Sequence, residues 1–198
     1  MWKKRRASVF MCKKISELHG LNPHTILSRY FDASSPSVNA KDILNRMDIY
    51  VRKVDFAPLE DELYIKGKDQ ILGLAASSGD DVIILYSEIL DPVMANYVLA
   101  HELAHCCLHL PVSTEFHVEL KTRDDIYQIP RESSSDFFKV PSDNALREQD
   151  ADQFTAQLLI PDILLNKIKS YADPPDATTV STILGVPQKI ALMRLTSL

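Results

Sequence analysis

The sequence predicts an α+β fold, in which a small, mostly antiparallel sheet packs on helices. Three observations lead to this prediction. Short runs rich in β-branched and aromatic residues lie between residues 49 and 86. Two longer segments, at about 92–110 and 143–160, carry apolar residues at the three- and four-residue spacing of helices. Residues 162–198 contain shorter segments of the same helical kind.

The composition is that of an ordinary globular chain. Of the 198 residues, 45% are hydrophobic and 25% are charged, which is enough apolar material for one domain with a hydrophobic core. The formal net charge of −5 disfavours nucleic-acid binding over the whole surface. We therefore expect one domain over residues 1–198, with residues 1–35 as an N-terminal helical extension and residues 162–198 as C-terminal helices.

Cysteine usage and the N-terminal segment indicate the compartment. The three cysteines, two of them neighbours at 106 and 107, do not form a disulfide framework, which favours a reducing environment. The basic start at residues 1–6 is followed by an apolar stretch too short for a signal peptide. No apolar run reaches the length of a membrane span. A cytoplasmic protein without a membrane partner is expected.

Residues 7–47 are expected to form three helices. Apolar positions recur through residues 7–19, and Gly20 is placed to end the first helix. Asn22 and Pro23 can begin a second, and the third is expected at 39–47 after a polar linker. The first two also describe a helix-turn-helix, but the basic residues precede this motif instead of lining its second helix. A DNA-binding regulator is therefore the least favoured interpretation.

Four short segments are expected to form the sheet: residues 49–54, 63–65, 71–75 and 82–86. Residues 77–81, which are rich in serine, glycine and aspartate, are typical of a hairpin connection between the last two. An edge strand of such a sheet can hold a peptide in extended form by backbone pairing. The sheet leads directly into the helix that carries the clearest chemistry.

That helix is expected between Asp91 and Pro111. Asp91 can cap its N-terminus, and Pro92 suits the first helical position, where a missing N–H costs nothing. Pro111 ends it. Its inner face combines apolar residues with two histidines, and the members of that face are Met94, Tyr97, Val98, His101, His105 and Leu108.

The helix carries His101, Glu102 and His105 in the pattern H-E-x-x-H. Residues four apart project from the same helix face about one turn apart, so the two imidazoles can bind one metal ion. A catalytic zinc ion needs three protein ligands and one open position for water, and Glu102 can act on that water as general base. The sequence therefore predicts half of a hydrolytic zinc site. The alternative is that two core histidines are four residues apart by chance.

The third ligand must come from another segment. His109 continues the same face, but eight residues of helix rise about 12 Å, while Zn–N bonds are about 2 Å long. One ion therefore cannot be held by residues 101, 105 and 109 together. For His109 we expect a polar contact or a favourable charge near the helix C-terminus.

A second helix, from an N-cap at Ser142 through Ile160, carries two carboxylates among apolar and small residues. Glu148 and Asp152 lie one turn apart on its inner stripe. Buried carboxylates need positive charge. A zinc ion would supply it to Glu148, and Asp152 could accept a hydrogen bond from a ligating histidine. The alternative is a solvent-facing acidic surface that includes Asp150.

Residues 110–141 have the proline and serine content of a long loop, with a strand at about 116–120. Loops of this length in small domains are often lids or binding loops. His117 and Tyr127, with Arg131 nearby, could stabilise an oxyanion over the metal or could be ordinary loop residues. We therefore predict that His117 or Tyr127 stabilises the oxyanion.

These motifs resemble those of the ImmA/IrrE family of bacterial and phage-associated metallo-endopeptidases, within the gluzincin group. The resemblance rests on HELAH at 101–105, LH at 108–109, EQDADQFTAQLLIP at 148–161 and the closing segment 180–195. It begins at about residue 37. It implies a zincin-like core, formed by the H-E-x-x-H helix and a second ligand-bearing helix.

The resemblance also implies roles for individual residues. Glu102 would be the general base, and Asp152 would hold a ligating histidine, although many family members have asparagine there. Asp150 is kept as the alternative ligand. Two histidines and a carboxylate also suit manganese, iron or cobalt, but the family motif favours zinc. The implied ligands of Zn²⁺ are His101, His105 and Glu148.

Family members typically cleave helix-turn-helix transcriptional repressors of mobile elements or stress responses. The resemblance therefore implies an intracellular zinc-dependent endopeptidase whose partner is a separately encoded repressor, without direct nucleic-acid binding of its own. The alternative is a regulatory or antitoxin-like interaction protein that keeps the zinc site but has little or no proteolytic activity. Replacing Glu102 with glutamine separates the two, because only the peptidase would lose its function.

Overall fold

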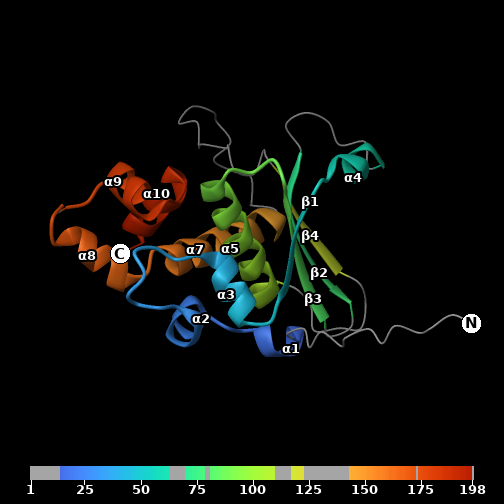
Figure 1. Cartoon of the computed structure of the whole chain (residues 1–198), viewed down its shortest axis with the longest axis horizontal. Helices are drawn as coiled ribbons and strands as arrows, with labels where there is room; N and C mark the ends of the chain where they lie inside the picture. The colour runs from blue at the N-terminus through green and yellow to red at the C-terminus, as the bar shows by residue number, and fades with distance from the viewer. Residues whose placement is uncertain are drawn as a thin grey trace, which may run out of the picture.

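In the part of the chain that the structure describes, a four-stranded mixed sheet has most of the helices on one face (Figure 1). The computed structural model describes residues 14–62, 70–78, 81–109, 117–122, 143–172 and 174–197. The α+β class predicted from the sequence is confirmed. The strands are β1 (Tyr50–Val54), β2 (Ile71–Ser78), β3 (Asp81–Ser87) and β4 (His117–Thr122). The helices are α1 (Ile15–Leu18), α2 (Pro23–Tyr30), α3 (Ala40–Arg46), α4 (Ala57–Glu62), α5 (Pro92–Leu108), α7 (Asp143–Leu159), α8 (Asp162–Lys169), α9 (Ala177–Leu184) and α10 (Gln188–Thr196).

The strands follow the order β1-β3-β2-β4 across the sheet. The β2–β3 and β2–β4 pairs are antiparallel, so the sheet is mostly antiparallel, as predicted. β1 instead runs parallel to β3, with Tyr50 opposite Ile83. A parallel pair needs a long crossover, and here α4 and β2 lie between the two strands in the chain. β4 ends the described sheet on the other side.

α5 is the central helix and packs against β2, β3 and α7 (Figure 1). The Asp91 side chain accepts a hydrogen bond from the Met94 N–H at 2.9 Å, and Pro92 lies in the first turn, as the sequence predicts. Every residue from Tyr97 to Cys107 is buried, because the sheet lies on one side of the helix and α7 on the other. The expectation that Leu108 points inward is wrong. This last helical residue is 37% exposed.

Apolar residues pack on both faces of the sheet, since alternate residues of a strand point to opposite sides. The larger cluster lies between the sheet and the helices, and it includes Ala75 of β2 and Ile84 of β3. The smaller cluster covers the opposite face, with Leu59 of α4 packed against it. α4 was not predicted from the sequence, because six residues are too few to show a helical period. The buried members of the smaller cluster are Phe56, Ile71, Leu74 and Ala76.

The remaining predicted elements lie close to their expected positions or outside the described residues. α3 and α7 differ from the predicted segments by a few residues at their ends, and α8, α9 and α10 lie in the region 162–198 that was expected to form C-terminal helices. Of the helix predicted at 7–19, the structure describes only α1, and Gly20 follows it with a φ of +81°. The strand predicted at 63–65 and the cap at Ser142 lie outside the described residues.

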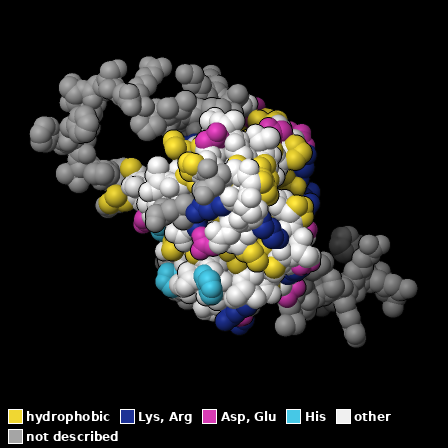
Figure 2. Space-filling view, turned by 90° about the vertical axis from the view of Figure 1, so that its left-hand side faces the viewer, with side chains coloured by type: hydrophobic (Ala, Val, Ile, Leu, Met, Phe, Trp, Pro, Cys, Tyr) yellow, Lys and Arg dark blue, Asp and Glu magenta, His cyan; other side chains and the backbone are white. Residues whose placement is uncertain are grey.

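The surface on the side of α8, α9 and α10 carries charges of both signs. Figure 2 shows Lys and Arg side chains interspersed with Asp and Glu over the described part of this face. Such a mixture differs from the one-sided basic surface of nucleic-acid-binding domains. Among the described residues, no helix combines the length and the apolar character needed to cross a membrane.

Candidate metal centre

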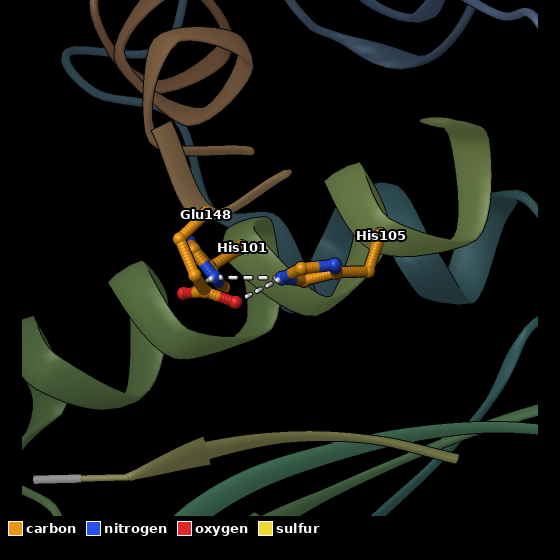
Figure 3. Close-up of side chains that lie close together, drawn as sticks. All are labelled: His101, His105 and Glu148. Atoms are coloured by element: carbon orange, nitrogen blue, oxygen red, sulfur yellow. Dashed lines mark hydrogen bonds and ion pairs between the residues drawn. The ribbon is translucent and has the colours of Figure 1, made fainter. Parts of the chain in front are cut away.

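Three side chains from two helices come together where α5 packs against α7 (Figure 3). The Nε2 atoms of His101 and His105 are 3.0 Å apart. Glu148 Oε2 is 3.3 Å from His101 Nε2, and Glu148 Oε1 is 3.2 Å from His105 Nε2. Both histidines are buried, while the glutamate side chain is 20% exposed. The two imidazoles and the carboxylate therefore face one common point.

The spacing of these atoms fits a tetrahedral metal ion. Nitrogen and oxygen ligands at bond lengths of about 2.0–2.1 Å are separated by about 3.3 Å along the edges of a tetrahedron, close to the three separations observed. Three protein donors are also the number that catalytic zinc sites use. Across the described ranges, this is the group of histidine, cysteine and acidic side chains that could hold a metal ion.

Asp152 lies one turn after Glu148 on α7 and is buried beside His101. Its Oδ1 is 3.1 Å from His101 Nδ1, although the contact is not aligned as a hydrogen bond. The Tyr97 hydroxyl donates to the same oxygen at 2.7 Å. Burial, followed by the Asp152 charge, raises the pKa of Tyr97 well above its ordinary value, so the hydroxyl keeps its proton. Asp152 thus has a fixed position behind the imidazole.

The C-terminal helix also reaches Asp152. Lys189 Nζ, in the first turn of α10, is 3.0 Å from Asp152 Oδ2. Arg194 anchors the same helix a second time, by donating to the Ile160 carbonyl at 3.0 Å and pairing with Asp162. The Asp152 carboxylate, which α7 carries, therefore contacts residues of both α5 and α10.

Sequence reasoning did not single out Tyr97 or Lys189 as site residues. Tyr97 appeared only as an apolar member of the inner helix face. Its place four residues before His101 is a usable signal, since that spacing puts the two rings 5.7 Å apart. Lys189 gives no local signal, because it is 37 residues from Asp152 and only the packing of α10 on α7 brings the two together.

Glu102 is fully buried on α5 and faces β2. A Cβ atom placed on Gly73 would lie 2.5 Å from both Glu102 Oε1 and Val98 Cγ1, which is closer than real Cβ contacts. Glycine inside a strand lowers stability, and its presence marks a place where another group approaches closely. Gly73 therefore makes room for the Glu102 carboxylate between the helix and the sheet.

Gly73→Ala is expected to destabilise the protein by about 1–3 kcal/mol through overpacking, although alanine is otherwise favoured over glycine inside a strand. Urea unfolding measures this change. Val98→Ala should also destabilise, but the double variant should lose less than the two single losses together, because one of the two clashing groups is gone. Additive losses would contradict the role given to Gly73.

Two buried cysteines follow His105 on α5. Burial raises the pKa of Cys107 to about 12. Burial, followed by the proximity of the Cys107 side chain and the Glu102 carboxylate, raises the pKa of Cys106 well above its ordinary value. Because the thiolate is the reactive and metal-binding form, both side chains are inert thiols at neutral pH.

Other residues considered from the sequence lie outside the cluster. Asp150, the alternative ligand, is exposed on α7 and does not belong to it. His109 does not belong to it either, and instead contacts His105. His117 begins β4, of which only the backbone is described, and Tyr127 and Arg131 lie outside the described residues. Oxyanion stabilisation by His117 or Tyr127 stays a prediction.

Two histidines from one helix and a glutamate from a second, packed beside a small mixed sheet, define a domain of the metallopeptidase class. The chain matches the family model Peptidase_M78, described as the IrrE N-terminal-like domain, over residues 45–196. This match covers well over half of the chain, so the protein belongs to that family, as the resemblance to ImmA/IrrE proteins implied. No curated protein and no solved structure matches the chain significantly.

Proposed function

We propose that this protein is a cytoplasmic, zinc-dependent endopeptidase that cleaves a separately encoded helix-turn-helix repressor of a mobile element or stress response. The observation that carries the proposal is the convergence of His101, His105 and Glu148, with Glu102 buried next to the first histidine. Two histidines and a glutamate are the ligand set of catalytic zinc in peptidases. Membership of a peptidase family supports the reaction, and the choice of a repressor as substrate rests on the family resemblance.

Each residue has a role that follows from its position. His101, His105 and Glu148 would hold a zinc ion, which would supply Lewis acidity toward the scissile carbonyl and would lower the pKa of water. Glu102 takes a proton from the attacking water and passes it to the leaving amine nitrogen. Asp152, whose Oδ1 lies 3.1 Å from His101 Nδ1, would accept the Nδ1 hydrogen when the metal is bound and so orient the ring, with Nε2 facing Glu148 and His105. Hydrolysis then breaks the C–N bond and adds the elements of one water molecule to the two fragments.

The sheet provides a way to hold the substrate. β4 is the last strand of the described sheet and pairs with β2 on one side. α5 packs against it, and in Figure 3 a strand with the olive colour of β4 passes beneath the three side chains. An extended segment that paired with β4 would place its carbonyl groups near the site. A loop or linker of the repressor suits this mode of binding better than a folded helix.

The proposal is tested by intact-mass analysis of the helix-turn-helix regulator encoded beside this gene, after incubation with the zinc-loaded protein. We expect two fragments whose masses sum to that of the regulator plus one water. A sample treated with a chelator should leave the regulator whole, and added zinc should restore cleavage.

A regulator that stays whole but co-purifies with the zinc-loaded protein would contradict the peptidase proposal. It would favour the alternative, a regulatory or antitoxin-like interaction protein that retains the zinc site. A regulator that is neither cut nor bound would show that the substrate was chosen wrongly.

A further inference from the structure

α5 ends at a third histidine whose ring contacts the ring of His105. His109 Nδ1 is 3.0 Å from His105 Nδ1, and the ring centroids are 5.0 Å apart. The backbone holds the same pair together, because the His109 N–H donates to the His105 carbonyl at 2.8 Å. His109 is thus beside a candidate ligand without sharing its metal position.

The direction of the hydrogen bond follows from the other side of the His105 ring. His105 Nε2 faces His101 Nε2 and Glu148 Oε1, at 3.0 and 3.2 Å, so it is the atom that faces the metal position. A ligating nitrogen carries no hydrogen, which leaves the ring hydrogen on His105 Nδ1. His109 Nδ1 is then the acceptor, with its own hydrogen on Nε2.

His109 also connects the two helices that carry the candidate ligands. Arg147 Nη2 donates to the His109 carbonyl at 3.4 Å. Arg147 directly precedes Glu148 on α7. One residue at the end of α5 therefore touches a histidine of the cluster with its ring and the neighbour of the glutamate with its backbone.

We propose that His109 is a positioning residue that fixes the ring of His105 for metal binding, as Asp152 does for His101. Each histidine would then be contacted at Nδ1, the ring nitrogen that faces away from the metal position. The partner of His101 is a carboxylate on α7, and the partner of His105 is the imidazole at the end of α5. Groups that orient ligating histidines set the tautomer and the direction of the ring, and their loss lowers metal affinity. This inference rests on the metal site of the proposed function but not on proteolysis.

The test compares His109→Phe with His109→Asn in the full chain, with zinc affinity measured by competition against a chromogenic chelator. Phenylalanine keeps the bulk of the ring but accepts no hydrogen bond, so zinc should bind about 10- to 100-fold more weakly. Asparagine has an acceptor oxygen close to the place of Nδ1 and should restore affinity to within about threefold of the wild type. His24→Phe, the same change at an exposed histidine of α2, is the matched control and should bind zinc normally.

Unchanged affinity in His109→Phe, or equal losses in the phenylalanine and asparagine variants, would overturn the proposal. A second readout needs no variant that must fold. In the zinc-loaded wild type, the ¹⁵N spectrum of the histidine rings should show His105 with its hydrogen on Nδ1 and His109 with its hydrogen on Nε2. A hydrogen on His109 Nδ1 would also overturn it, since two N–H groups would then face each other.

These outcomes are separate from the fate of the peptidase proposal. If no regulator is cleaved but zinc affinity follows the presence of an acceptor at position 109, the positioning role stands and the protein uses its zinc otherwise. If the regulator is cleaved but zinc affinity does not depend on His109, the peptidase proposal stands and the positioning role of His109 is wrong.

Discussion

Glu102→Gln is expected to slow cleavage of the regulator by about 10²- to 10⁴-fold, the usual contribution of a general base. Glutamine has nearly the same shape as glutamate, so it fits the buried space above Gly73, but its amide cannot accept the proton of the attacking water. The metal ligands are unchanged, and zinc affinity should therefore stay close to that of the wild type. Cleavage rates from intact-mass time courses and chelator competition measure the two quantities.

The matched control is Glu88→Gln, the same change at an exposed residue just after β3. This variant should cleave at the wild-type rate. Full activity in Glu102→Gln would contradict the assignment of the base. Loss of both activity and zinc in that variant would instead show that Glu102 supports the site structurally.

Glu148→Ala is expected to weaken zinc binding by more than about 100-fold. This exceeds the loss of about 10- to 100-fold that is usual for a residue that only hydrogen-bonds to a metal ligand. The change removes one of three donors that face the common point. Binding to the native state alone also stabilises it, by about 2.7 kcal/mol when zinc is at about 100 times its Kd. Wild-type protein should therefore gain thermal stability on addition of zinc, while the variant at the same zinc concentration should gain little.

Asp150→Asn is the control for this second prediction, since Asp150 is the alternative ligand and is exposed on the same helix. It should retain the zinc-dependent rise in melting temperature. If Asp150→Asn loses that rise and Glu148→Ala keeps it, the third ligand has been assigned to the wrong carboxylate.

The ligand-bearing helices are well predicted because their signals are local. Asp91 and Pro92 mark the start of α5, and the spacing of His101 and His105 follows from the helical period alone. The same period puts Glu148 and Asp152 on one stripe of α7. A search for two helical faces that carry metal-binding side chains therefore finds the residues that the structure brings together.

The strand pairing was predicted only in part. The pairing of β2 with β3 is local in the chain, and the serine, glycine and aspartate residues of 77–81 predict a hairpin connection from the sequence. The parallel pairing of β1 with β3 depends on how α4 and β2 are placed between them, and nothing in the residues of β1 specifies that partner. α4 itself escaped detection because its six residues cover less than two helical turns.

What the sequence determined by itself is thus the α+β class, the two helices and the residues of the metal cluster, since periodicity and capping act within a few positions of the chain. Only the tertiary structure decided which residues contact Asp152 and Glu102 next to that cluster. Lys189 meets Asp152 across 37 residues, and Gly73 meets Glu102 across the interface of strand and helix. Such contacts depend on how whole helices and strands pack against one another. The residues around Lys189 or Gly73 in the sequence therefore do not identify the side chain that each one meets.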